Sequence, residues 1–230
     1  MLRIIKMKLK QYIKNKQPSN YTIDGLQVQI VNLGSLDYDK IKSYIVKFQK
    51  VMPKFLRRGV KKISVGLFDF LEKRNLTAAY DDGTIYISNV ANDDYILDEI
   101  VHEAAHSVEE LYRDEIYADS LIENEFKSKR EILWMRLKDK GFEIEIDQFL
   151  KPEYSRKVDL FLYQKVGYPI LRSLTTDLFF SPYGSTSLRE YFANGFESYW
   201  LKEELPRLKR VSPALYRKIS SISNMEKEDE

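Results

Sequence analysis

Residues 98–111, DEIVHEAAHSVEEL, place two histidines four residues apart on one predicted helix, and the chain contains no other histidine. Residues at this spacing lie one turn apart on the same face, so His102 and His106 could grip one metal ion. Glu103 follows the first histidine directly, where a carboxylate can serve as a general base. The apolar residues of the stretch recur at helical spacing, which predicts that one face packs on a core.

The composition is that of a globular protein of 230 residues, with 43% hydrophobic and 13% aromatic residues. The absence of cysteine excludes disulfides and thiolate ligands, so any metal must be held by histidine and carboxylate groups. No apolar run is long enough for a transmembrane segment, and residues 1–16 lack the apolar core of a secretory signal. We therefore expect a cytoplasmic protein, with release by a route that leaves no signal as an open alternative.

Charge is distributed unevenly along the chain. Residues 1–74 contain 17 lysines and arginines against 5 acidic residues, whereas residues 75–124 contain 13 acidic residues and one basic residue. An acidic surface around the histidine pair would attract a basic peptide or protein substrate. The alternative is a set of solvated faces without a partner. The basic first third shows no recognised nucleic-acid-binding signature, so no nucleic-acid partner is expected.

Periodicity and turn signals predict an α+β fold: a small mixed β-sheet with an edge hairpin packs on the histidine helix, and a mainly α-helical lobe follows (zincin-like). The first part is expected to contain a strand pair turning at Asp24-Gly25, a helix over 37–52, a central strand over 62–70 and a hairpin turning at Asp82-Gly83. The second part is expected to contain helices over 115–138 and 154–174, a helix from 188 stopped by Pro206, and a short helix over 213–222.

In domain terms, residues 1–20 are predicted to form a basic N-terminal arm or helix. Residues 21–223 are predicted to form one domain, with an α/β lobe over 21–112 and a helical lobe over 113–223. Residues 224–230 are predicted to be a disordered acidic tail.

A catalytic zinc site usually has three protein ligands, so the histidine pair needs a carboxylate partner. The metzincin arrangement is excluded, because its later glycine and histidine positions hold Glu109 and Tyr112. Glu109 itself lies two turns from His102, about 10 Å along a straight helix, too far to share one small ion.

Two carboxylates remain as third ligand. Glu115 follows His106 by nine residues, and no glycine or proline helps the chain to fold back between them. Glu190 lies on a separate predicted helix, far enough along the chain to cross the first. The spacing favours Glu190 and leaves Glu115 as the alternative. Ser187 and Glu190 also match a helix-capping box, which is the structural interpretation of the same glutamate.

Three motifs resemble the catalytic domain of anthrax lethal factor and its peptidase relatives, which are gluzincin-type zinc metallopeptidases. They are His102-Glu103-Ala-Ala-His106, Tyr183 seven residues before Glu190, and Glu190-Tyr-Phe-Ala-Asn194-Gly-Phe. The resemblance covers about residues 76–222 and implies Zn²⁺ held by the two histidines and Glu190. It also implies that Glu103 and Tyr183 are catalytic.

The chain departs from that family in two ways. Asn194 stands where the lethal factor has an acidic residue. We therefore expect weaker hydrogen-bonding support for the ligand side chains. The distance along the chain between the two motif helices is also longer, which suggests a helical insertion at about residues 115–175. The segment Ser212-Pro-Ala-Leu-Tyr216 resembles the closing helix of the family.

The expected function is therefore that of a zinc-dependent endopeptidase. Its substrate backbone would lie along Ala79-Tyr80 or along the arm at residues 85–88, because an open strand can bind an extended peptide. One alternative is a catalytically silent protein of the same fold with a structural or partner-binding role, for example in a phage or mobile element. Another is a zinc hydrolase that acts on a non-peptide amide.

Overall fold

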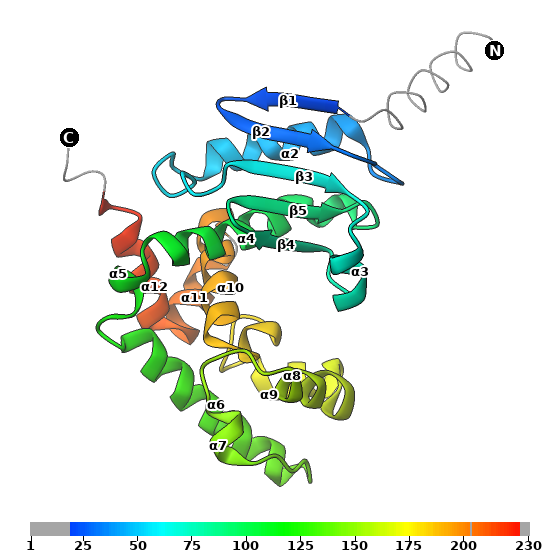
Figure 1. Ribbon diagram of the computed structural model, residues 1–230. Helices are drawn as coiled ribbons and strands as arrows, with labels where there is room; N and C mark the ends of the chain where they lie inside the picture. The colour runs from blue at the N-terminus through cyan, green and yellow to red at the C-terminus, as the bar shows by residue number, and fades with distance from the viewer. Residues whose placement is uncertain (1–18, 203, 226–230) are drawn as a thin grey trace. The chain divides into compact units, whose positions relative to one another are not determined.

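The structure, a computed structural model, describes residues 19–202 and 204–225 (Figure 1). The described residues fall into two compact units, divided between Val108 and Glu109. Residues 1–18 of the predicted N-terminal arm and residues 226–230 of the predicted tail lie outside the described residues. The α+β class is confirmed: the first unit contains a mixed sheet and the second is helical. Among the described helices, none has the length and apolar character needed to cross a membrane.

Five strands form the sheet of the first unit, in the order β1-β2-β3-β5-β4. The pairs β1–β2 and β4–β5 are antiparallel, whereas β2–β3 and β3–β5 are parallel. The strands are β1 (Ser19–Ile23), β2 (Leu26–Ile30), β3 (Lys62–Gly66), β4 (Ala78–Asp81) and β5 (Thr84–Ser88). The sheet is thus mixed, as predicted, and the second hairpin supplies its edge strand β4.

Both predicted hairpin turns are present. Asp24 and Gly25 have φ values of 44° and 84°, and Asp82 and Gly83 have φ values of 38° and 76°. Two successive residues with positive φ are typical of the tight hairpin turn whose twist matches that of its strands. Aspartate and glycine tolerate this conformation better than other residues, which is why the sequence signal was reliable.

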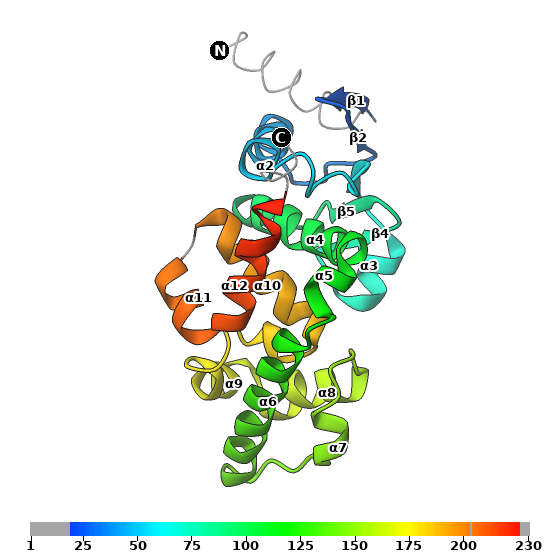
Figure 2. The same ribbon diagram turned by 90° about the vertical axis from the view of Figure 1, so that its left-hand side faces the viewer.

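One face of the sheet is buried under two helices, α2 (Tyr38–Val51) and α4 (Ile96–Leu111), and Figures 1 and 2 both show these helices on the same side. Val28, Ile63 and Ile85 stand side by side in register on that face, and each is at most 1% exposed. Helix α2 buries three apolar residues at helical spacing (Ile41, Ile45 and Phe48), and Asp37 caps its start by accepting a hydrogen bond from Lys40 N at 2.9 Å.

The strand predicted over residues 62–70 is shorter than expected. It ends at Gly66, and the chain then forms α3 (Asp69–Arg74). The apolar residues here fit either period, and the acidic Asp69 and Glu72 in the first turn favour a helix through its dipole. Phe68 packs edge-on against Tyr86, with ring centroids 5.1 Å apart, so the aromatic signal reflects packing rather than strand pairing.

The second unit is a helical assembly (Figure 1). Its elements are α5 (Arg113–Tyr117), α6 (Leu121–Asp139), α7 (Ile146–Phe149), α8 (Arg156–Leu160), the π-helix η2 (Phe161–Val166), α9 (Tyr168–Thr175), the 3₁₀ turn η3 (Tyr183–Ser185), α10 (Leu188–Leu201), α11 (Leu205–Val211) and α12 (Pro213–Ile222). The closing helix expected over 213–222 is therefore present. The predicted helices over 115–138 and 154–174 are each interrupted, at Ser120 (φ 57°) and Gly167 (φ 79°).

Pro206 starts a helix instead of stopping one. Helix α10 ends at Leu201, where Lys202 adopts a left-handed conformation with φ 58°, and Pro206 lies in the first turn of α11. Proline is favoured there because the first turn of a helix leaves its N–H groups unbonded in any case. Trp134 of α6 is half-buried.

Helices α6, α10 and α12 form the core of the helical unit. Phe126, Phe179 and Tyr191 make a cluster whose ring centroids lie 5.6 to 6.1 Å apart. Gly195 allows α12 to approach α10 closely, because a β-carbon at this position would collide with the side chain of Leu215. The glycine in the α10 motif is thus explained by packing.

Candidate metal centre

Helix α4 carries the two histidines on one face while its other face packs in the core. The imidazole centroids of His102 and His106 lie 5.3 Å apart with their planes nearly perpendicular. His106 is 5% exposed, and His102 and Glu103 are half-buried. The apolar stripe that orients the helix is buried as predicted for Val101, Ala104, Ala105 and Val108, whereas Leu111 is 41% exposed.

His102, His106 and Glu190 form a group that could hold a metal ion. One ligand atom from each side chain lies within 4.8 Å of the ligand atoms of the other two. Two imidazoles and one carboxylate are the donor set of many catalytic zinc sites, so these residues fit zinc, although the geometry does not by itself identify the metal. The alternative ligand Glu115 is exposed and is not a member of this group.

Glu190 lies in the first turn of α10, and the structure also contains part of the predicted cap. The Ser187 hydroxyl accepts a hydrogen bond from Glu190 N at 3.2 Å, with Ser187 in an extended conformation as helix N-caps prefer. The cap involves the backbone N–H of Glu190, whereas the carboxylate of Glu190 belongs to the group that could hold a metal ion. Capping and metal binding therefore use different atoms of the same residue.

Tyr183 lies in the short turn η3 that precedes α10, and it is 44% exposed. The turn is closed by Thr186, whose hydroxyl donates to the Tyr183 carbonyl at 2.8 Å. Asn194 connects this turn to α10: its amide oxygen accepts a hydrogen bond from Ser181, and its amide nitrogen donates to the Glu190 carbonyl at 2.9 Å. Asn194 thus links the turn that carries Tyr183 to the helix turn that carries Glu190.

Arg130 of α6 also binds the turn η3, and no pattern in the sequence predicted this. Its guanidinium donates to the carbonyl oxygens of Ser185 at 2.7 Å and Thr186 at 3.1 Å, and also to the carbonyl of Phe149. The side chain is 1% exposed and lies over the Phe149 ring, 4.2 Å from its centroid. Burial lowers the pKa of Arg130. A single cation thus binds two carbonyls of the short segment between Tyr183 and the start of α10.

Glu109, excluded as a ligand by its distance along the helix, makes a different contribution. Its carboxylate accepts a hydrogen bond from the Tyr117 hydroxyl at 2.7 Å and forms an ion pair with Arg189 at 3.5 Å. Burial, followed by the negative charge of Glu109, raises the pKa of Tyr117. In the sequence, Glu109 follows His106 by three residues and Arg189 directly precedes Glu190.

Glu99 places a further carboxyl group one helical turn before Glu103. Burial is the main cause that raises the pKa of Glu99, and the nearby charges of Glu103 and Asp98 raise it further. A hydrogen bond with the Thr77 side chain and the proximity of His102 act in the opposite direction. The four-residue spacing from Glu99 to Glu103 was visible in the sequence, but its burial was not.

The strand order of the sheet distinguishes between the two segments predicted to bind a peptide, Ala79-Tyr80 and residues 85–88. Among the strands that the structure describes, β4, with Ala79 and Tyr80, pairs only with β5 and lies at the edge of the sheet. Strand β5 pairs with β3 on one side and with β4 on the other, so the arm at residues 85–88 has no open backbone for an added strand. The second of the two predicted peptide-binding segments is therefore wrong.

Comparisons with known proteins do not add to this account. No protein-family model matches the chain, and neither the curated proteins nor the solved structures give a match. The resemblance to the lethal factor family therefore stays a prediction that rests on the three short motifs.

Proposed function

We propose that the chain is a zinc-dependent endopeptidase. The observation that carries this proposal is the group of His102, His106 and Glu190, whose ligand atoms lie within 4.8 Å of one another, with Glu103 next to the first histidine on the same helix. When bound, zinc lowers the pKa of water and polarises a carbonyl group. Peptide hydrolysis needs both effects, together with a base that is not itself a ligand.

In this proposal Glu103 is the general base. Its carboxylate accepts a proton from the attacking water and later delivers that proton to the leaving amine. Tyr183 donates a hydrogen bond from its phenol to the oxygen that becomes negative in the transition state. Arg130 and Asn194 act as positioning residues for Tyr183, because both hold the turn in which it lies.

The proposed substrate is an extended peptide. The edge strand β4 offers backbone groups along Ala79 and Tyr80 to which a peptide can add as a further strand. The 13 acidic residues within residues 75–124 favour a peptide of basic character. A protein that keeps this fold without turnover is the second candidate, and a complete set of ligand and acid–base residues argues against it.

The proposal is tested with the full chain, loaded with zinc, and a pool of synthetic peptides analysed by mass spectrometry. We expect cleavage within the peptides that is abolished by a chelator and by Glu103→Gln. Glu110→Gln is a matched control, because Glu110 is an exposed glutamate on the same helix. Bound zinc without cleavage of any peptide would favour the catalytically silent protein, and cleavage that survives Glu103→Gln would overturn the assigned base.

A further inference from the structure

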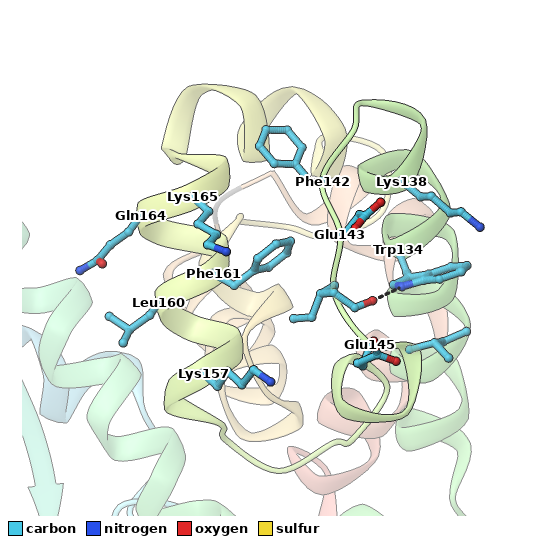
Figure 3. Close-up of a pocket in the computed structure, with 12 residues that line it drawn as sticks. Trp134, Lys138, Phe142, Glu143, Glu145, Lys157, Leu160, Phe161, Gln164 and Lys165 are labelled. Carbon is cyan, nitrogen blue, oxygen red and sulfur yellow. Dashed lines mark hydrogen bonds between the residues drawn. The ribbon is translucent and has the colours of Figure 1, made fainter.

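A second site is suggested by a pocket of about 670 Å³ in the helical unit (Figure 3). One wall is formed by the end of α6 and the segment of residues 142–146, and the other wall by α8 and η2. All of these elements lie in the predicted helical insertion, and none of the residues that line the pocket is a candidate ligand or catalytic residue. The volume is in the range of pockets that bind small molecules or side chains.

Aromatic side chains line both walls of this pocket. Trp134 and Phe142 are half-buried, and the Trp134 indole donates to the Ile144 carbonyl at 2.8 Å, which fixes its ring (Figure 3). Phe161 begins the π-helix η2 and turns its ring toward the opposite wall. π-helical turns are rare and are found frequently at functional sites.

The segment of residues 142–145 supplies free backbone groups. It runs past the pocket without belonging to a helix or strand (Figure 3). Among the described residues, none accepts a hydrogen bond from the N–H groups of Glu143, Ile144 or Glu145. The carbonyl of Glu143 likewise accepts no hydrogen bond from a described residue. Such a segment can pair with the backbone of another extended chain.

The rim of the pocket carries opposite charges on its two walls. Glu143 and Glu145 lie on one wall, and Lys157 and Lys165 on the other, where Figure 3 shows both ammonium groups turned toward the pocket. No ion pair joins these four residues to one another or to any other described residue. The charges are thus available to a ligand that carries both signs.

We propose that this pocket binds an extended peptide segment, which places an apolar side chain between the aromatic walls and pairs its backbone with residues 143–145. Acidic side chains of the peptide would face Lys157 and Lys165, and basic side chains would face Glu143 and Glu145. A peptide fits better than a small apolar anion, because only a peptide uses the open backbone groups and both charged walls. The binding does not depend on the metal or on Glu103.

Trp134 provides a direct readout of binding. The chain contains two tryptophans, so Trp200→Phe leaves Trp134 as the single one, and the indole nitrogen of Trp200 makes no hydrogen bond to a residue that the structure describes. The probes are acetylated and amidated heptapeptides with the core Leu-Ser-Phe-Ser-Leu, flanked by Asp and Lys, by two Asp or by two Lys. Fluorescence is titrated in the full-length Trp200→Phe, Glu103→Gln protein with a chelator present, so that cleavage and metal play no part.

We expect the Asp/Lys peptide to change Trp134 fluorescence in a saturable manner. Lys157→Glu with Lys165→Glu should weaken the two-Asp peptide by about tenfold and strengthen the two-Lys peptide, since each exposed charge pair contributes modestly. Lys151→Glu, an exposed lysine outside the pocket, should change neither. Glu145→Pro, at a residue whose φ of −61° suits proline, removes one open N–H group and should weaken all three peptides.

The proposal is overturned if no peptide changes Trp134 fluorescence, or if the paired lysine reversal has the same effect as Lys151→Glu. It is also overturned if anilinonaphthalene sulfonate binds in a lysine-dependent manner while no peptide does, because the pocket would then take a small apolar anion. Each of these results is independent of whether the protein cleaves peptides.

Discussion

Helix α4 and the segment of residues 181–194 both supply metal-ligand candidates, but they are positioned by different means. In α4 the spacing of His102 and His106 is fixed by the helix itself, and the buried apolar face orients the pair. The second segment depends on distant residues, because Arg130 lies 55 residues from Ser185 along the chain. A local motif can therefore supply two ligands, whereas the third ligand and Tyr183 require tertiary contacts.

Substitutions at one proposed catalytic residue in each region should give the largest effects on rate. Glu103→Gln is expected to lower kcat by about 10²- to 10⁴-fold, the usual contribution of a general base. Tyr183→Phe is expected to lower kcat by about 10²- to 10³-fold, because it removes one oxyanion donor. Both variants should retain zinc, as measured by elemental analysis of the proteins used for kinetics. An unchanged kcat in Tyr183→Phe would leave the 181–194 segment with a purely metal-binding role.

Arg130→Met tests whether the second region depends on a distant cation. The substitution leaves three buried carbonyl oxygens without their donor, so we expect the free energy of unfolding in urea to fall by about 3 kcal/mol. Lys127→Met on the same helix is the matched control, since Lys127 is 44% exposed and its ion pair with Glu123 should contribute less than about 1 kcal/mol. Equal stability of the two variants would contradict the proposed role of Arg130.

Lys129, the residue before Arg130, allows a test by pH. Burial lowers its pKa from 10.5 to about 8, an effect partly offset by Glu125. The unfolded chain therefore binds more protons than the folded chain between pH 8 and 10.5, and stability linked to Lys129 rises with pH in this window. Between pH 8 and pH 10, we expect the free energy of unfolding of wild type to rise by about 2 kcal/mol relative to that of Lys129→Met. Parallel pH profiles would show that Lys129 is not buried as described.

Asn194→Ala should have the smallest effect, because it removes two neutral hydrogen bonds. The expected loss is about 1 to 2 kcal/mol in the free energy of unfolding, with a lower kcat and unchanged zinc content. Asn194→Asp keeps the acceptor for Ser181 but loses the donor to the Glu190 carbonyl, so its stability should lie between wild type and Asn194→Ala. If both variants match wild type in kcat, the link between the turn and α10 is not needed for activity.

The parts of the structure that local patterns determine were predictable. Turn residues and apolar periodicity predict the two hairpins and the helices α2, α4 and α12. In each case the signal lies within the element itself. The limits of β3 were not, because Phe68 satisfies an aromatic contact with Tyr86 instead of a strand partner. The metal-ligand candidates were found because their residue types are chemically distinctive.

Other contributions to the site had no signal in the sequence. Arg130 looks like one of many charged residues on a predicted helix, and only its burial against three carbonyl oxygens distinguishes it. Helix geometry excluded Glu109 as a predicted ligand, but its pairing with Arg189 depends on the packing of residues far apart in the chain. Long-range contacts of this kind cannot be derived from spacing.

The most direct test of the account is the zinc content of the purified full-length protein, measured by elemental analysis in wild type, Glu190→Ala and Glu115→Ala. We expect about one zinc ion per chain in wild type and in Glu115→Ala, and loss of zinc in Glu190→Ala, because a catalytic zinc site needs three protein ligands. Zinc retained in Glu190→Ala, or lost only in Glu115→Ala, would contradict the metal centre. Wild-type protein that takes up no zinc at all would contradict the enzyme proposal as a whole.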